Sequence, residues 1–351
     1  MRSDAAHKAY ESSWGEKVPG HQRGKLLMKL ADAFEAHADE LASLEALDNG
    51  KAFGIARGFD VMEAAACLRY YGGWADKDHG KVIEVDNSKL AYTRHEPIGV
   101  VGQIIPWNFP LLMLAWKWGP ALACGNTIVM KTSETTPLSG LYATTLAKDI
   151  FPPGVINLIS GFGAITGAAM SSHPLIEKIA FTGSTLVGRT IMKAAANSNL
   201  KKVTLELGGK SPNIIFDDAD LEQAVGWACF GLFFNHGQCC CAGSRIYVQE
   251  SIYDKFMQAF DKKVQALKVG NPFAEDTFQG PQVSVSSGAL TSRSLTALGR
   301  THRTRRTSTT ASCSTSTRQS RRARPSTQAA SATAPRATLS SPPSSPTSSP
   351  T

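Results

Sequence analysis

The chain has 351 residues, of which 42% are hydrophobic, so it is long enough to form two domains with apolar cores. Its net charge of +8 comes from one segment, because residues 284–351 contain 10 arginines and no acidic residue, whereas residues 1–283 hold the other 27 basic and all 29 acidic residues. No run of about 18 apolar residues is present, and Met1 is not followed by the apolar stretch of a secretory signal. We therefore expect an intracellular, cytoplasmic protein without a membrane span, a compartment in which free thiols persist.

Residues 284–351 differ in composition from the rest of the chain. They consist largely of Ser, Thr, Arg, Ala and Pro and contain no aromatic residue, no isoleucine and no lysine. Such a segment buries too little apolar surface to offset the entropy lost on folding, so we predict that it is disordered.

Two helical segments are predicted near the N-terminus. Between residues 24 and 47 apolar residues recur at spacings of three, four and seven, which predicts one amphipathic helix that ends at Asn49-Gly50. A second helical stretch runs towards Gly80, and one side of it carries Phe59, Met62, Ala66, Tyr70 and Trp74. We interpret these aromatic residues as core.

The pattern then changes to β structure. Val82–Val85 and Leu90–Thr93, separated by a turn at residues 86–88, predict a hairpin. Five short apolar strands follow, alternating with helical segments: residues 100–105, 127–130, 155–159, 178–181 and 203–207. This alternation needs crossover helices, so the predicted fold is α/β with a doubly wound parallel sheet.

Ligands bind beyond the carboxyl ends of the strands in such sheets, and the strand exits here are unusual. Glu134, after the second strand, is placed to accept hydrogen bonds from ribose hydroxyls and to repel a 2′-phosphate, which favours NAD over NADP. Lys131 is either a second ribose or phosphate contact or a solvated lysine. The turn Gly183-Ser184-Thr185 opens a helix and suits a phosphate, although it is also a common helix N-cap. Residues 161–167 are a near miss of the dinucleotide fingerprint.

Three consecutive cysteines, Cys239, Cys240 and Cys241, lie in a glycine-rich turn that begins at Asn235. Cysteine reacts as the thiolate, and polar, glycine-rich backbone lets a carbonyl substrate approach, so this turn is a candidate nucleophile site. A zinc site is the first alternative, but no second Cys-x-x-Cys or Cys/His pair completes a tetrahedral set. Three core cysteines are the second alternative.

Three motifs in order carry a resemblance to a known family: Pro106-Trp107-Asn108-Phe109-Pro110, Leu205-Glu206-Leu207-Gly208-Gly209-Lys210 and Gly237-Gln238-Cys239-Cys240-Cys241-Ala242-Gly243. With them the chain resembles the NAD(P)-dependent aldehyde dehydrogenase superfamily from about Ala6 to Val283. The resemblance implies oxidation of an aldehyde to a carboxylic acid through a cysteine thiohemiacetal and thioester, with hydride passing to the nicotinamide.

The resemblance also implies residue roles. Cys240 matches the nucleophile, Asn108 matches the side-chain donor of the oxyanion hole, and Glu206 matches the base that activates water for thioester hydrolysis. In the cofactor site, matches fall on Trp107, Lys131, Glu134, Gly163, Gly183 and Ser184. The implied domains are residues 1–79 and 97–207 for NAD binding, 80–96 for oligomerisation, and 208–283 for the start of a catalytic domain.

The chain departs from the family pattern at both ends. The family's further N-terminal segment has no match before Met1, which keeps the mitochondrial matrix open as a compartment. The family's Glu-x-Phe-Gly-Pro motif, whose glutamate holds the nicotinamide ribose, occurs nowhere. We therefore expect an incomplete catalytic domain and an incomplete interface for the family's homo-oligomer. Residues 341–348 match a one-base shift of a family strand, so we expect residues 284–351 to be an out-of-frame tail or a retained intron, with a genuine low-complexity segment as the alternative.

Two other functions compete with an NAD-dependent aldehyde dehydrogenase. A non-catalytic protein could bind RNA or other anionic partners through the arginine-rich tail, but without aromatic residues such binding would be electrostatic, and specific nucleic-acid binding is not expected. An esterase-only chain would use Cys240, Asn108 and Glu206 without a nicotinamide.

Overall fold

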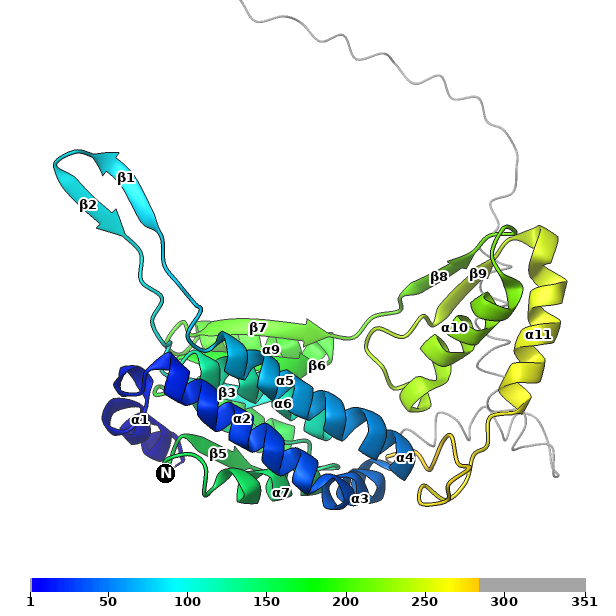
Figure 1. Cartoon of the computed structure of the whole chain (residues 1–351), viewed down its shortest axis with the longest axis horizontal. Coiled ribbons are helices and arrows are strands. Elements are labelled where there is room, and N and C mark those ends of the chain that lie inside the picture. Colours follow the sequence, from blue (N-terminus) through cyan, green and yellow to red (C-terminus); the bar gives the residue numbers. More distant parts are fainter. Residues whose placement is uncertain (1, 284–351) are drawn as a thin grey trace, which may run out of the picture.

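The computed structural model of the chain describes residues 2–283 (Figure 1). Its centre is a parallel sheet of five strands in the order β5-β4-β3-β6-β7. The strands are β3 (Val100–Ile104), β4 (Thr127–Lys131), β5 (Ile156–Ile159), β6 (Lys178–Gly183) and β7 (Lys202–Leu207). These bounds confirm the five predicted strands within one or two residues, and the order confirms the doubly wound α/β fold class.

Helices cover both faces of this sheet. They are α1 (Arg2–Ser12), α6 (Pro110–Ala123), α7 (Leu138–Ala147), α8 (Ala168–Ser172) and α9 (Thr185–Ala196), with the short helices η1 (Gly15–Lys17) and η3 (Gly163–Gly167) between them. On one face α6 and α7 pack over β4 and β5 and join the largest apolar core. On the other face α1, α8 and α9 enclose a second core that contains Ile104, Ile179 and Phe181. Burial on both faces explains why β3 and β4, in which every residue is buried, read as nearly continuous apolar runs. In β7 exposed residues alternate with half-buried ones.

An outer layer of helices packs on α6 and α7. It consists of α2 (Gly20–Ala36), α3 (Ala38–Asn49), α4 (Phe53–Ile55), η2 (Ala56–Val61) and α5 (Met62–Trp74). The predicted single helix over residues 24–47 is therefore wrong: the backbone breaks at His37, with φ −111° and ψ 32°. The predicted end is right, because Gly50 has φ 81° and closes α3. A side chain at Gly50 would also collide with the carbonyl oxygen of Pro281.

The interpretation of the aromatic side of α5 as core is also wrong. Tyr70 and Trp74 are 59% and 50% exposed, and Ala66 is exposed as well. The buried side of the helix carries small residues instead, among them Ala64, Ala65 and Gly72. Small residues let α5 lie close to α2 and α6. The side of α5 that permits this close approach faces inward, and the side with the large aromatic rings faces outward.

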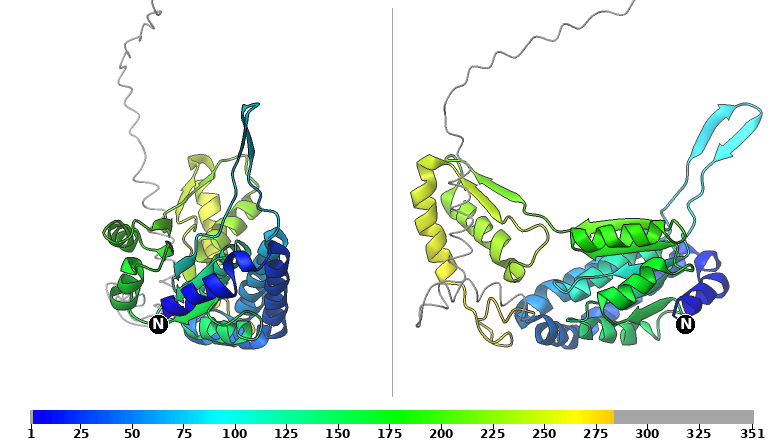
Figure 2. Two further views of the ribbon diagram at one scale, coloured as in Figure 1. Left: turned by 90° about the vertical axis from the view of Figure 1, so that its left-hand side faces the viewer. Right: turned by 180° about the vertical axis from the view of Figure 1, so that it is seen from behind.

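The predicted hairpin is present as β1 (Val82–Asp86) and β2 (Lys89–Tyr92), which pair antiparallel. It projects away from the body of the molecule in every view (Figures 1 and 2). The side chains of Val82, Leu90 and Tyr92 are 81%, 79% and 66% exposed. The hairpin thus presents apolar surface that no other described segment covers.

A smaller α/β unit follows β7. It contains the parallel pair β8 (Pro212–Ile215) and β9 (Arg245–Val248), the helices α10 (Leu221–Phe233) and α11 (Tyr253–Gln265), and the short helices η4 (Phe234–Gly237) and η5 (Glu250–Ile252). Phe233, Phe256 and Phe260 form the centre of its own core. The predicted domain boundaries remain predictions, and the expectations for residues 284–351 lie outside the described residues. No helix within residues 2–283 is long and apolar enough to cross a membrane.

Candidate active site

The cysteine turn follows three residues in the left-handed backbone region. Asn235, His236 and Gly237 have φ values of 52°, 61° and 70°. A non-glycine residue in this region costs of order 1 kcal/mol or more, so surrounding contacts must hold the turn in place. One such contact comes from Asn235, whose buried side-chain amide donates to the backbone oxygen of Asn108 at 2.8 Å. Burial lowers the pKa of His236 to about 4, so its imidazole is neutral at pH 7.

The three cysteines that follow have different surroundings. Cys239 packs against the largest core, and burial raises the pKa of its thiol to about 11. The sulfur atoms of Cys239 and Cys241 lie 3.5 Å apart. The residue Cys240 is exposed. Partial burial of its sulfur raises the pKa of the Cys240 thiol above the ordinary value, and the charge of Cys241 adds to this shift. Cys240 is therefore a protonated, accessible thiol at neutral pH.

No cluster of three His, Cys, Asp or Glu side chains in residues 2–283 is arranged to hold a metal ion. Within this part of the chain the cysteines lack the further ligands that a tetrahedral zinc site requires. The interpretation as three core cysteines is wrong for Cys240 and Cys241, which are both exposed.

Cys240 and Glu206 line the same open cavity, whose volume is about 1390 Å³. Its floor is one face of β3, β6 and β7, which contributes Gln103, Thr182 and Thr204, and its walls include residues of α5 and α6. Glu206 lies near the carboxyl end of β7 and is exposed. A thiol and a carboxylate thus face one space that a small molecule can enter.

Lys117 is a cavity residue that the sequence analysis missed. It lies on α6 and lines the cavity together with Glu206. Burial lowers the pKa of Lys117 to about 8; the charge of Glu206 opposes this shift and that of Lys178 adds to it. Its signal in the sequence is that it is the single charged residue of α6, whose other residues are apolar.

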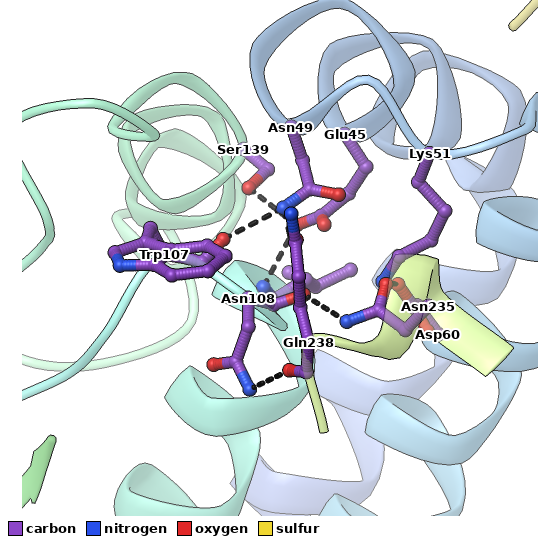
Figure 3. Close-up of polar contacts among 10 residues, drawn as sticks. Glu45, Asn49, Lys51, Asp60, Trp107, Asn108, Ser139, Asn235 and Gln238 are labelled. Atoms are coloured by element: carbon purple, nitrogen blue, oxygen red, sulfur yellow. Dashed lines mark hydrogen bonds and ion pairs between the residues drawn. The ribbon is translucent and has the colours of Figure 1, made fainter. Parts of the chain in front are cut away.

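Asn108 connects the sheet to the cysteine turn (Figure 3). It lies just before α6, and its side-chain nitrogen donates to the carbonyl oxygen of Gln238 at 2.7 Å. Its neighbour Trp107 is half-buried, and the backbone oxygen of Trp107 accepts a hydrogen bond of 2.7 Å from Asn49. The predicted oxyanion donor is therefore joined directly to the residue two positions before Cys240.

The side chains predicted for the adenosine ribose lie at the end of β4. Lys131 is 3% exposed, and its ammonium group donates to the backbone oxygen of Thr132 at 2.9 Å and to Glu134 at 3.1 Å. Burial acts to raise the pKa of Glu134, but hydrogen bonds from its backbone and from Lys131 outweigh burial and lower it. Glu134 is thus a partly exposed carboxylate with a fixed orientation.

The predicted phosphate turn lies at the end of β6. Ser184 is the N-cap of α9, and its hydroxyl accepts from the backbone N–H of Val187 at 3.3 Å. Gly183 is the last residue of β6, and Gly163 begins η3 after β5 with open space where a side chain would lie. The first N–H groups of α9 have no partner within the helix, so this end can receive an anion.

The structure therefore forms two groups of predicted residues. Cys240 and Glu206 share the cavity, and Asn108 is bonded to the cysteine turn beside it. The predicted cofactor residue Trp107, beside Asn108, does not line this cavity, and neither do the other five: Lys131, Glu134, Gly163, Gly183 and Ser184. These five residues lie at or just after the carboxyl ends of β4, β5 and β6, which are all at the same edge of the parallel sheet. In the sheet β5 is next to β4, and β3 lies between β4 and β6.

Comparison with known proteins gives one consistent family. Residues 2–295 match the profile of the aldehyde dehydrogenase family. An aldehyde dehydrogenase of Davidiella tassiana is 66% identical over 281 residues, which cover 80% of this chain and 56% of that protein. The human mitochondrial aldehyde dehydrogenase is 57% identical over 282 residues, covering 80% of this chain and 54% of the relative. The chain thus spans about half the length of these relatives.

Solved structures give the same result. An NAD+ complex of an aldehyde dehydrogenase from Bacillus cereus superposes with a TM-score of 0.81 at 48% identity, covering 84% of this chain and 60% of that chain. A betaine aldehyde dehydrogenase from Staphylococcus aureus, described with NAD+ and a BME-modified cysteine, superposes with a TM-score of 0.80 at 44% identity, covering 84% and 59%.

Proposed function

The chain belongs to the aldehyde dehydrogenase family, and from that premise we propose that it oxidises a small aldehyde to a carboxylic acid with a nicotinamide cofactor. The observation that carries the proposal is the shared cavity of Cys240 and Glu206, beside a turn to which Asn108 is hydrogen-bonded. A nucleophile, a carboxylate and an oxyanion donor in this arrangement match the needs of acyl transfer through a covalent intermediate.

In the first stage the sulfur of Cys240 attacks the aldehyde carbon, a C–S bond forms, and the thiol proton is lost. Because the pKa of this thiol is raised, its proton must be removed as the C–S bond forms, and water in the open cavity can carry it to solvent. The carbonyl oxygen becomes an oxyanion that accepts hydrogen bonds from the side chain of Asn108 and the backbone of Cys240. A nicotinamide held by this chain would supply the acceptor for the hydride that the former aldehyde carbon loses, and the thioester would then remain on Cys240.

In the second stage Glu206 takes a proton from water, and the water oxygen attacks the thioester carbon. The same oxyanion donors act again, the C–S bond breaks, and the carboxylic acid leaves. Glu206 is exposed to the cavity, so water reaches it without a conformational change.

The residues at the sheet edge fit a dinucleotide. Glu134 and Lys131 would hold the adenosine ribose, and the N-terminus of α9, capped by Ser184, would hold phosphate. Apolar side chains beside these residues are exposed, including Ile165 and Leu186 at 71% and 77%, and an adenine ring would cover them. The charge of Glu134 opposes a 2′-phosphate, which supports NAD over NADP.

The exposed hairpin supports a homo-oligomer as the functional form. Its side chains Val82, Leu90 and Tyr92 would be covered by a second copy of the chain. We also propose the cytoplasm as the compartment, with the mitochondrial matrix as the alternative because the human relative is named mitochondrial.

The proposal is tested by titrating the purified chain with NAD and an aldehyde, and separately with p-nitrophenyl acetate alone. We expect NADH formation that saturates with both substrates, and ester hydrolysis without NAD. Hydrolysis of the ester without any NADH would reject the oxidation while retaining the nucleophile. Absence of both activities, together with Cys240 that iodoacetamide does not alkylate, would reject the site.

A further inference from the structure

We propose that Glu45 and Asn49, one turn apart at the end of α3, are positioning residues that hold the Trp107–Asn108 loop and the start of α6 in the geometry of the oxyanion hole. The inference rests on the proposed function, since it assigns residues that act through Asn108. The sequence pattern gave neither residue a functional role, since Asn49 was named only as part of the helix end Asn49-Gly50, and both are fully buried.

Glu45 replaces a missing helix cap. One of its oxygens, Oε1, accepts the backbone N–H of Leu111 at 2.8 Å and the hydroxyl of Ser139 at 2.6 Å. Leu111 is the second residue of α6, and the N-cap residue Phe109 supplies no side-chain hydrogen bond. A free N–H group at a buried helix start needs an acceptor, and a distant glutamate provides it. Glu45 thereby ties the start of α6, three residues after Asn108, to α3 and α7.

Asn49 holds the peptide just before α6 (Figure 3). Its side-chain nitrogen donates to the backbone oxygen of Trp107 at 2.7 Å and approaches that of Asn108 at 3.5 Å. From the opposite side of the chain Asn235 donates to the same Asn108 oxygen at 2.8 Å. Two buried amides therefore fix the carbonyl groups on either side of the Asn108 backbone nitrogen and with them the direction of its side chain.

The surroundings of Glu45 are compatible with a neutral side chain such as glutamine at this position. Lys51 and Asp60 form a buried ion pair beside it, and the ammonium group of Lys51 lies 4.3 Å from the ring centre of Phe109. Burial raises the pKa of Glu45 to about 7; Asp60 adds to the shift, while Lys51, Ser139 and the Leu111 N–H oppose it. Its second oxygen has no hydrogen-bond partner among the described residues. A glutamine oxygen at the Oε1 position would keep both hydrogen bonds.

If the buried hydrogen bonds of Glu45 and Asn49 served only stability, they would not need to contact the Trp107–Asn108 loop. Buried polar groups are costly unless every hydrogen bond is made, and apolar residues of similar volume often stabilise a core as well. Here the hydrogen bonds of Glu45 and Asn49 reach the loop of Asn108 and the start of the helix behind it. Asn108 in turn reaches the cysteine turn through Gln238, so the contacts form one chain from α3 to the residues before Cys240.

The test compares Glu45→Gln with Glu45→Leu in the full chain. The main measurement is the rate at which p-nitrophenyl acetate acylates Cys240, with alkylation of Cys240 by iodoacetamide and circular dichroism measured in parallel. We expect Glu45→Leu to slow acylation by about 10- to 100-fold. The reason is that a shift of about 1 Å in the position of the Asn108 amide is enough to weaken its hydrogen bond to the oxyanion. Alkylation needs no oxyanion hole and stays unchanged. Glu45→Gln should acylate within about threefold of wild type.

Asn49 gives an independent pair. Asn49→Asp keeps the size but points an acceptor at the Trp107 oxygen, so we expect it to slow acylation at least as much as Asn49→Leu, with alkylation again unchanged. The inference is overturned if Glu45→Leu and Asn49→Asp acylate at the wild-type rate. It is also overturned if their losses of acylation are matched by equal losses of alkylation and of helical signal, because the role would then be structural only.

One further measurement keeps this inference separate from the proposed function. If wild-type Cys240 is not acylated, the proposed function fails, and hydrogen exchange at the Leu111 amide then decides the positioning. Glu45→Leu should speed this exchange by at least about tenfold relative to wild type, whereas Glu45→Gln should not. Equal exchange in all three chains would overturn the positioning as well.

Discussion

The side-chain amide of Asn108 donates one hydrogen bond of 2.7 Å to the carbonyl oxygen of Gln238, two residues before Cys240. A carboxamide nitrogen carries two hydrogens, so one N–H is held by this bond and the other is left for a ligand. The bond therefore aims the donor without using it up. It also joins the loop between β3 and α6, which carries Asn108, to the smaller unit, which carries Cys240.

Asn108→Ala should slow acylation of Cys240 by p-nitrophenyl acetate by about 100-fold, because removal of one oxyanion donor costs of that order. Stopped-flow release of p-nitrophenol measures the rate. Asn157→Ala is the control, since Asn157 is also buried but donates to backbone oxygens of Ile128 and Gly154, away from the cavity. Equal rates for Asn108→Ala and wild type would remove Asn108 from the oxyanion hole.

Cys240→Ser should abolish both dehydrogenase and esterase activity, because the hydroxyl is a far weaker nucleophile than the thiol in the same place. Cys239→Ser and Cys241→Ser should each retain activity within about tenfold of wild type. Mass spectrometry after a single turnover with the ester should find the acyl group on Cys240. A similar loss from all three substitutions would instead indicate a structural cluster.

Glu206→Gln should impair hydrolysis of the thioester more than its formation, since the second stage needs a base for water. We expect a burst of NADH, followed by steady turnover at least about 100-fold slower than in wild type. Rapid-mixing absorbance at the NADH band separates the two phases. If the burst disappears as well, Glu206 acts before the thioester forms.

Lys117→Met should stabilise the chain at neutral pH, with a benefit that fades as the pH rises. The pKa of Lys117 is lowered to about 8 in the folded chain, below its usual 10.5, so between these values the unfolded chain binds more protons. The wild-type chain therefore gains stability from this group as the pH rises from 8 towards 10.5, and the methionine variant does not. The difference in Tm between Lys117→Met and wild type should be smaller at pH 10 than at pH 7.5. The control is Lys148→Met, which replaces an exposed lysine. A constant difference would contradict the assignment.

Glu134→Gln should raise the use of NADP relative to NAD by about tenfold, because it removes the charge that repels a 2′-phosphate and keeps the size of the side chain. The ratio of kcat/KM for the two cofactors measures this preference. Where turnover is too slow, the quenching of tryptophan fluorescence on cofactor binding serves instead. An unchanged ratio would show that Glu134 does not contact the ribose.

Local pattern was sufficient for the strands, because each is a short β-prone segment bounded by turn residues. The strands β3, β4, β5, β6 and β7 were each predicted within one or two residues. The hairpin β1–β2 was predicted for the same reason, because its turn residues and β-prone segments are adjacent in sequence. The motif residues were also found in the sequence, since strand ends and the cysteine turn lie next to patterns that can be read locally.

The sequence by itself thus determined the α/β class, the strands and the residues placed at their ends, because these depend on neighbours a few positions apart. Only the tertiary structure decided which side of α5 is buried, where the helix breaks at His37, and which partners the buried polar groups find. The Leu111 N–H is bonded by Glu45, 66 positions away, and the Asn108 amide by Gln238, 130 positions away. Such pairs depend on how helices and turns cross in space, where small residues permit close approach and each buried donor must meet an acceptor.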